Sequence, residues 1–198
     1  NINYDTNSIK IVSIGRLVNF KTYNEQIIKI LDKLNEELNI NLEYHIYGYG
    51  DNENYLKEIS KDIKSKIFFH GILNYSMFSE VLKDCLLFVG SGTAIIEASS
   101  LGIPSIIGIE SNLKGETYGF FSDLKGYSYN EDNLNINKDY YYNVIEEFFL
   151  SKKGEYYSNL HIKKAAEFLI ENTSGLFVKY SLEARKTMLD LILSNHHQ

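Results

Sequence analysis

The sequence predicts an α/β fold, in which a parallel sheet carries helices on both faces and is followed by extra C-terminal helices. Short β-rich runs alternate with amphipathic helical patterns along the first half of the chain, which is typical of parallel sheets covered by helices. The 198 residues and 44% hydrophobic content suffice for one domain with a sizeable core. Helical patterns without intervening strands fill residues 139–194. We therefore expect residues 1–198 to form a single α/β domain.

The first predicted unit is a strand, a loop and a helix. "IKIVSI", from Ile9 to Ile14, is a short β-rich run that ends at Gly15, and apolar residues then recur at helical spacing from Tyr23 to Leu38. Further strands are predicted at "LEYHIY" (42–47), "KIFFH" (66–70), "LLFV" (86–89) and "PSIIGI" (104–109). Further helices are predicted over residues 53–63, 76–84, 94–101, 139–150, 158–171 and 175–194.

The order of these elements predicts where a ligand would bind. In Rossmann-like sheets of strand order 3-2-1-4-5-6, ligands occupy a crevice at the carboxyl ends of the first and fourth strands. The loops after those strands are "GRLVNFK" (Gly15 to Lys21) and "GSGT" (Gly90 to Thr93). Two loops far apart in the sequence should therefore meet.

A long connection, residues 110–130, follows the fifth strand at the same end of the sheet. Loops of this length are usually functional or disordered. Its three glycines, with Tyr118, Phe120 and Phe121, favour a functional loop on the ligand side.

Composition excludes several classes of protein. Twenty basic residues against 26 acidic ones give a net charge of −6, which has the wrong sign for a nucleic-acid surface. The single cysteine, Cys85, cannot form an internal disulfide, which favours a reduced, cytoplasmic chain and a buried thiol. No apolar run is long enough to span a bilayer, and the first residues have no signal-peptide character. The chain begins with asparagine shortly before the first strand, as expected of a segment of a longer protein.

The "GSGT" loop allows two interpretations. Gly90 and Gly92 lack the third glycine and the later acidic residue of a dinucleotide site, which disfavours NAD. Small residues at a helix start can instead bind an anion through backbone N–H groups. The alternative is a tight turn in which Ser91 or Thr93 serves as the N-cap.

Three charged residues also have two interpretations each. Glu97 either interacts with the dipole in the first helical turn or accepts hydrogen bonds from two ribose hydroxyls. Arg16 and Lys21 are either solvated or neutralise a diphosphate opposite "GSGT". A nucleotide-diphosphate site explains these three residues and the "GSGT" loop together.

The chain offers no sequence pattern for a metal. There is no Asp-x-Asp pair, and the five histidines show no ligand spacing, so that His45 and His70 are expected to be core or rim residues. Arg16 and Lys21 can supply the charge neutralisation that a divalent ion provides elsewhere. Neither a metal nor another cofactor is therefore expected.

Four stretches, in this order and spacing, resemble the carboxyl-terminal, donor-binding half of group 1 glycosyltransferases with the GT-B fold. They are "IVSIGRLVNFKTYNEQIIKIL", "YHIYGYGDNENYLKEI", "IFFHGILNYSMFSEVLKDCLLFV" and "IIEASSLGIPSII", and the resemblance covers roughly residues 9–109. The resemblance implies that Gly15 lies at the donor and that Arg16 and Lys21 bind its diphosphate and stabilise it as a leaving group. It further implies the following contacts: the amides of Gly90, Ser91, Gly92 and Thr93 with phosphate, Glu97 with the ribose, and His70, Gly71 and Ile72 with the base.

Two departures from the family bear on catalysis. The family often has a glutamate eight residues before the one at Glu97, but Val89 stands there and Asp84 is the closest preceding acid. The segment "ESNLKGETYGFFSDLKG" also differs from the glycine-rich loop usual after the fifth strand.

The resemblance implies a donor-binding domain of a metal-independent glycosyltransferase of the hexosyltransferase type. Its partners would be a nucleotide-sugar donor and an N-terminal acceptor domain absent from this chain. Without that domain, this chain alone would be inactive. The expected setting is polysaccharide or glycoconjugate assembly in the cytoplasm or at the inner face of the membrane, with any membrane contact made through the absent domain. A nucleotide-sugar epimerase and a non-catalytic nucleotide-sugar-binding domain are the alternatives.

Overall fold

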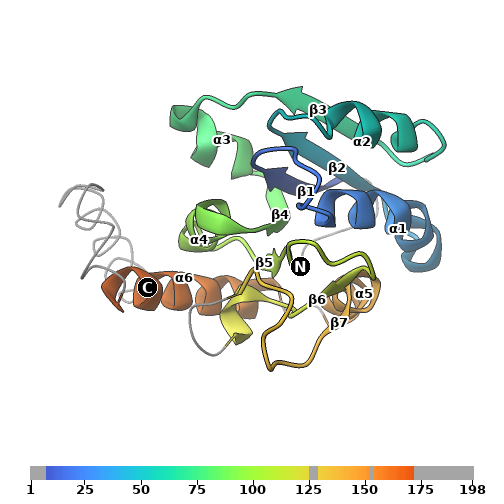
Figure 1. Ribbon diagram of the computed structural model, residues 1–198. Coiled ribbons are helices and arrows are strands. Elements are labelled where there is room, and N and C mark those ends of the chain that lie inside the picture. Colours follow the sequence, from blue (N-terminus) through green and yellow to red (C-terminus); the bar gives the residue numbers. More distant parts are fainter. Residues whose placement is uncertain (1–7, 125–128, 152–153, 172–198) are drawn as a thin grey trace.

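A computed structural model describes residues 8–124, 129–151 and 154–171 (Figure 1). Its centre is a five-stranded sheet of order β3-β2-β1-β4-β5 in which every pairing is parallel. The strands are β1 (Ile9–Ile14), β2 (Leu42–Tyr47), β3 (Ile67–Gly71), β4 (Cys85–Gly90) and β5 (Ser105–Ile107). The predicted α/β class and parallel sheet are thus confirmed, with β1 and β4 adjacent at the centre.

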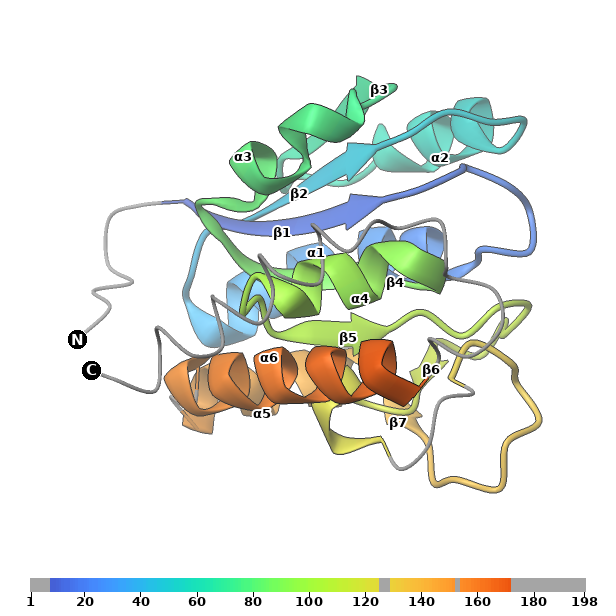
Figure 2. The ribbon, with the colours of Figure 1, turned by 90° about the vertical axis from the view of Figure 1, so that its left-hand side faces the viewer.

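Helices cover both faces of the sheet (Figure 2). They are α1 (Tyr23–Leu38), α2 (Glu53–Ser60), α3 (Phe78–Leu82), α4 (Gly92–Ser100), α5 (Tyr141–Ser151) and α6 (Gly154–Glu171). One buried cluster joins α1, α2 and α5 to the sheet, and a second joins α3, α4 and α6 to it. Ile11 belongs to the first cluster and Val12 to the second, because successive side chains of a strand point to opposite faces.

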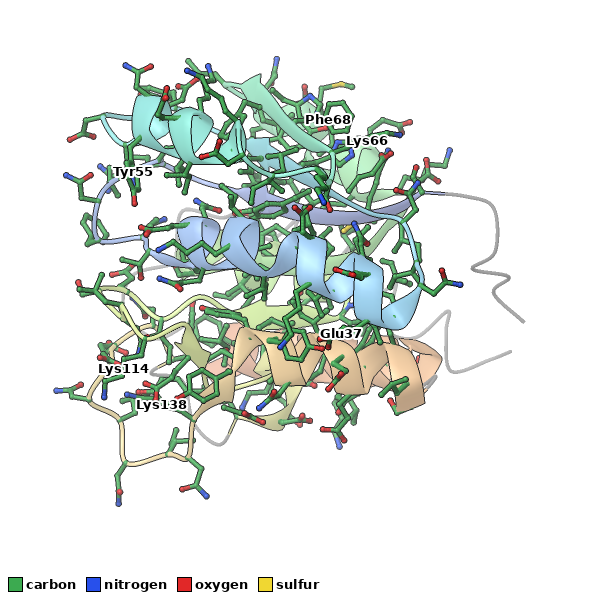
Figure 3. All side chains as sticks on the ribbon, turned by 90° about the vertical axis from the view of Figure 1, so that its right-hand side faces the viewer. Glu37, Tyr55, Lys66, Phe68, Lys114 and Lys138 are labelled. Carbon is green, nitrogen blue, oxygen red and sulfur yellow. The ribbon has the colours of Figure 1, made fainter. Side chains whose placement is uncertain are left out.

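The helix α5 packs on α1 through polar as well as apolar contacts. Tyr142 on α5 donates its hydroxyl proton to Glu37 of α1, and the ammonium of Lys33 lies 4.0 Å from the centre of the Tyr142 ring. Figure 3 shows Glu37 at this junction. The first of the extra C-terminal helices therefore completes the cover of one sheet face.

Several boundaries differ from the sequence prediction. The helix predicted to reach residue 63 ends at Ser60, because Asp32 accepts the backbone N–H groups of Lys64 and Ser65 and so turns the chain away. The helix predicted over 76–84 is shorter: a 3-10 turn, η1 (Tyr75–Met77), precedes α3. The helix predicted from residue 139 begins at 141, because residues 139–140 form β7 (Asp139–Tyr140). The one predicted from 158 begins at Gly154, and the one over 175–194 lies outside the described residues.

The described part of the long connection after β5 contains regular structure that the sequence did not predict. It contains β6 (Glu116–Thr117), which pairs antiparallel with β7, and a 3-10 turn, η2 (Phe121–Asp123). Tyr118, Phe120 and Phe121 are buried in the two core clusters. These aromatic side chains anchor the connection to the domain and are not available to a ligand.

None of the helices in the described ranges is long and apolar enough to cross a membrane. Cys85 is buried at the start of β4, as predicted, and burial raises the pKa of its thiol to about 12.

Candidate functional site at the carboxyl ends of β1, β4 and β5

The loop after β1 runs alongside the segment that follows β2. Gly15 donates its backbone N–H to Tyr47 O (3.0 Å), and Leu17 donates to Tyr49 O (2.9 Å). A Cβ on Gly48, which has φ +140°, would lie 1.8 Å from Gly15 O. Gly48 therefore permits a close backbone approach that no other residue allows. This approach lets the segment after β2 pack directly against the loop after β1.

Arg16 and Lys21 emerge from this loop with different exposure. Arg16 is exposed, whereas Lys21 is half-buried and folds back over Gly15, where a Cβ would lie 3.3 Å from Lys21 Nζ. Neither cation forms an ion pair with a carboxylate of the described residues. Burial lowers the pKa of Lys21, the charge of Glu110 opposes this, and the charge of Arg16 lowers it further. An anion bound between the two cations would relieve their repulsion.

The "GSGT" loop forms the start of α4, and Ser91 is its N-cap residue but does not cap the helix with its side chain. The Ser91 hydroxyl instead donates to Glu110 Oε1 at 3.3 Å. Thr93 lies inside the helix, which begins at Gly92. Gly92 has φ +66°, and a Cβ there would meet nothing within 4 Å.

The amide groups at the start of α4 consequently have no side-chain cap among the described residues. Because α4 is nine residues long, the positive end of its dipole adds to the attraction that these N–H groups exert on an anion.

Glu97 is the sixth residue of α4 and lies in its second turn. The dipole interpretation of Glu97 is therefore wrong, because that effect is confined to the first turn. Tyr75, on η1, donates its hydroxyl proton to Glu97 Oε1 at 2.8 Å. Burial raises the pKa of Glu97, and this hydrogen bond lowers it. Tyr75 thus orients the carboxylate from a neighbouring element, a contact for which the sequence carries no signal.

A third loop, after β5, joins the first two. Ser111 donates its backbone N–H to Phe20 O (2.6 Å), and Thr22 Oγ1 donates to Asn112 O (2.6 Å). These bonds tie the residues after Glu110 to the residues around Lys21. Glu110 was not among the residues expected at this site. The one available signal was its position directly after a strand that neighbours β4.

Tyr23 fills the space beneath the three loops. Burial raises the pKa of its hydroxyl to about 12, and the neighbouring Ser91 and Ser13 hydroxyls oppose this rise. Its ring lies against Gly108, where a Cβ would come within 2.4 Å of it. The floor of the site is therefore a neutral, fixed phenol, and the charges lie in the loops above it.

His70, Gly71 and Ile72 lie at the end of the edge strand β3. Gly71 O accepts the N–H of Gly48 at 2.7 Å, which links this segment to the loop after β1. His70 lies at the rim and stacks on Tyr47 with 4.2 Å between ring centres. The side chain of Ile72 is 72% exposed.

His45 is buried as expected, and its Nδ1 lies 2.9 Å from Nε2 of His70. Phe68, on β3, stacks on His45 of the neighbouring strand β2. Lys66, just before β3, forms an ion pair with Glu43 of β2. Figure 3 shows the side chains of Phe68 and Lys66. In the part of the chain that the structure describes, no group of three His, Cys, Asp or Glu is placed to hold a metal ion.

Val89 is fully buried in the core cluster beneath α1 and α5. Its position therefore offers nothing to a ligand. Asp84 is exposed and precedes β4, at the end of the strand opposite to Ser91. Neither position places a carboxylate at the site.

A sequence model of the family described as "Glycosyl transferases group 1" matches residues 1–114, more than half of the chain. The chain belongs to the group 1 glycosyltransferases. A search of curated proteins found no match for this glycosyltransferase chain.

Solved structures confirm the fold. The catalytic domain of cholesterol-alpha-glucosyltransferase from Helicobacter pylori is 22% identical, with a TM-score of 0.58, and the match covers 81% of this chain and 98% of that one. The pneumococcal O-GlcNAc transferase GtfA, solved with UDP and GlcNAc, is 17% identical with a TM-score of 0.58, and the match covers 93% of this chain and 36% of GtfA.

TarM is 22% identical with a TM-score of 0.53, and the match covers 97% of this chain and 37% of TarM. This glycosyltransferase chain thus spans nearly all of the first structure and little more than a third of GtfA and TarM.

Proposed function

We propose that this chain binds the nucleotide-diphosphate sugar of a metal-independent glycosyltransferase of the hexosyltransferase type. The proposal rests on two cations, Arg16 and Lys21, that have no carboxylate partner among the described residues and that lie at the same edge of the sheet as the start of α4, which no described side chain caps. A diphosphate would interact with both positive charges and accept hydrogen bonds from the amides of Gly90 to Thr93. GtfA, which shares this fold, was solved with UDP and GlcNAc, and this supports a nucleotide ligand for the proposed domain.

Each group has a defined part in the proposed reaction. As the bond from the sugar to the diphosphate breaks, negative charge grows on the leaving phosphate, and Arg16 and Lys21 stabilise it through charge-assisted hydrogen bonds. Glu97, held by Tyr75, would accept hydrogen bonds from the ribose hydroxyls. Gly15 lies beneath the phosphates, and His70, Gly71 and Ile72 border the base.

The acceptor side of the cleft is proposed to come from another domain. The chain spans little more than a third of GtfA and TarM, so that an N-terminal domain of the same protein would supply the acceptor site and any general base. On its own, the chain would then bind the donor without transferring it. Assembly of a polysaccharide or glycoconjugate in the cytoplasm is the setting we propose.

Val89 favours one second candidate. Because that core position carries no carboxylate, a non-catalytic nucleotide-sugar-binding domain is also compatible with the site. Assay of the parent protein with labelled donors separates the two: transfer to an acceptor supports the enzyme, and binding without transfer supports the second candidate.

Calorimetry with UDP, GDP and ADP tests donor binding directly. Arg16→Ala removes charge-assisted hydrogen bonds worth roughly 1.5 to 3 kcal/mol and should weaken diphosphate binding about tenfold or more, with nucleoside binding unchanged. Lys61→Ala is the matched control, because this exposed lysine follows α2 and makes its ion pair with Glu58. Glu97→Gln should reduce the contribution of the ribose instead. Equal affinity of Arg16→Ala and wild type for the diphosphate would contradict the proposal.

A further inference from the structure

Glu110 is a half-buried carboxylate held in place by its neighbours along the chain. Gly108 donates its N–H to Gly90 O at 2.7 Å, which continues the pairing of β5 with β4 beyond the strands. Glu110 itself donates its N–H to Asn130 O at 2.8 Å, and the next residue, Ser111, is bonded to Phe20 O at 2.6 Å. Hydrogen bonds therefore hold the backbone on both sides of Glu110. They fix the position of its carboxylate where the loops after β1, β4 and β5 meet.

The bonding capacity of this carboxylate is mostly unused. Within the described ranges, the hydroxyl of Ser91 at 3.3 Å is the one side chain that donates to it, and it forms no ion pair. An ionised carboxylate has about four acceptor sites and no donor. A ligand that satisfies Glu110 must therefore bring donors, and hydroxyl groups are the donors that a sugar carries.

The negative charge of Glu110 also disfavours the binding of a diphosphate that carries no sugar. This charge acts on Lys21, where it opposes the lowering of the pKa caused by burial. A diphosphate bound by Arg16 and Lys21 would therefore lie close to a like charge, which disfavours binding. A diphosphate that carries a sugar would offset this repulsion, because its hydroxyls donate to the same carboxylate.

We propose that Glu110 is a specificity-determining residue that accepts hydrogen bonds from the sugar hydroxyls of the donor and disfavours the nucleoside diphosphate without its sugar. The inference rests on the proposed function and deepens it. Neither Val89 nor Asp84 places a carboxylate at the site, whereas Glu110 lies directly beside the start of α4. After transfer, the same negative charge would favour release of the diphosphate product.

The test compares two affinities in each variant. Calorimetry measures the Kd of UDP, GDP and ADP and the Kd of the same nucleotides carrying glucose or N-acetylglucosamine. Wild type should prefer at least one of the sugar-bearing forms. Glu110→Gln keeps the shape of the side chain and its contact with Ser91, and it should bind that form about tenfold more weakly. It should bind the corresponding free diphosphate as tightly as wild type or a few-fold more tightly.

Glu36→Gln is the matched control, since it makes the same charge change at an exposed position near the far end of α1. Its ratio of the two affinities should equal that of wild type. If Arg16→Ala weakens diphosphate binding but Glu110→Gln leaves the ratio unchanged, or if wild type shows no preference for a sugar-bearing form, the role of Glu110 is wrong and the diphosphate site stands. If wild type binds none of these nucleotides, the proposed function itself fails.

Discussion

Replacing Gly48 with alanine should destabilise the fold through a collision between two backbone segments. The added Cβ would lie 1.8 Å from the carbonyl oxygen of Gly15 and 2.9 Å from its carbonyl carbon. Even a close C–H···O contact keeps its carbon and oxygen roughly 3.3 Å apart, so that the two segments must separate by about 1.5 Å. The contacted atoms of Gly15 belong to the backbone and the position of the Cβ is fixed by its own backbone, so no side-chain rotation can relieve the contact.

The cost can be worked out from the hydrogen bonds that hold these segments together. Separation weakens Gly15 N–H to Tyr47 O at 3.0 Å, Leu17 N–H to Tyr49 O at 2.9 Å, and Asn52 N–H to Leu17 O at 3.0 Å. Loss of two or three such bonds costs about 2–3 kcal/mol. The positive φ of +140° adds strain once a Cβ is present, of order 1–3 kcal/mol.

Gly119→Ala separates the two contributions. Gly119 has φ +87°, and a Cβ there would meet nothing within 4 Å, so that this variant carries the strain without the collision. Urea denaturation should show Gly48→Ala less stable than Gly119→Ala by about 2–3 kcal/mol, a difference of roughly 1 M in the midpoint. Equal losses in the two variants would refute the reasoning, because the backbone contact would then contribute nothing.

Three further outcomes follow from the burial of particular side chains. Tyr75→Phe removes the hydrogen bond that lowers the pKa of Glu97, so the pKa of that carboxyl should rise further in an NMR titration; an unchanged value would contradict the contact. Burial lowers the pKa of His161 in the fold, so the unfolded chain binds more protons below about pH 6.5. The free energy of unfolding, measured by urea denaturation, should therefore fall between pH 7 and pH 5.5, and fall less in His161→Gln. Since burial raises the pKa of Cys85 to about 12 and the thiolate is the reactive form, the native protein should not react with a thiol reagent at pH 8, whereas the urea-unfolded protein should react at once.

The sequence predicted most of the secondary structure because its signals are local. The alternation of β-rich runs with helical spacing located the central strands, and the rule for parallel sheets then brought the loops after β1 and β4 to one edge. Predicted helix ends were less accurate, because they depend on hydrogen bonds to other elements. Asp32, for example, ends α2 through Lys64 and Ser65, which lie more than thirty residues away.

By itself, the sequence determined the order of the elements, the family and the two loops that come to one edge of the sheet, since each depends on patterns within short stretches. Only the tertiary structure decided which side chains meet there. It brought Tyr75 to Glu97, and it placed Glu110 beside Ser91. It also showed that the Ser91 hydroxyl does not cap α4 and that the aromatic side chains of the long connection are buried. The physical reason is that these contacts join residues far apart in the chain, and their geometry is set by the packing of whole strands and helices.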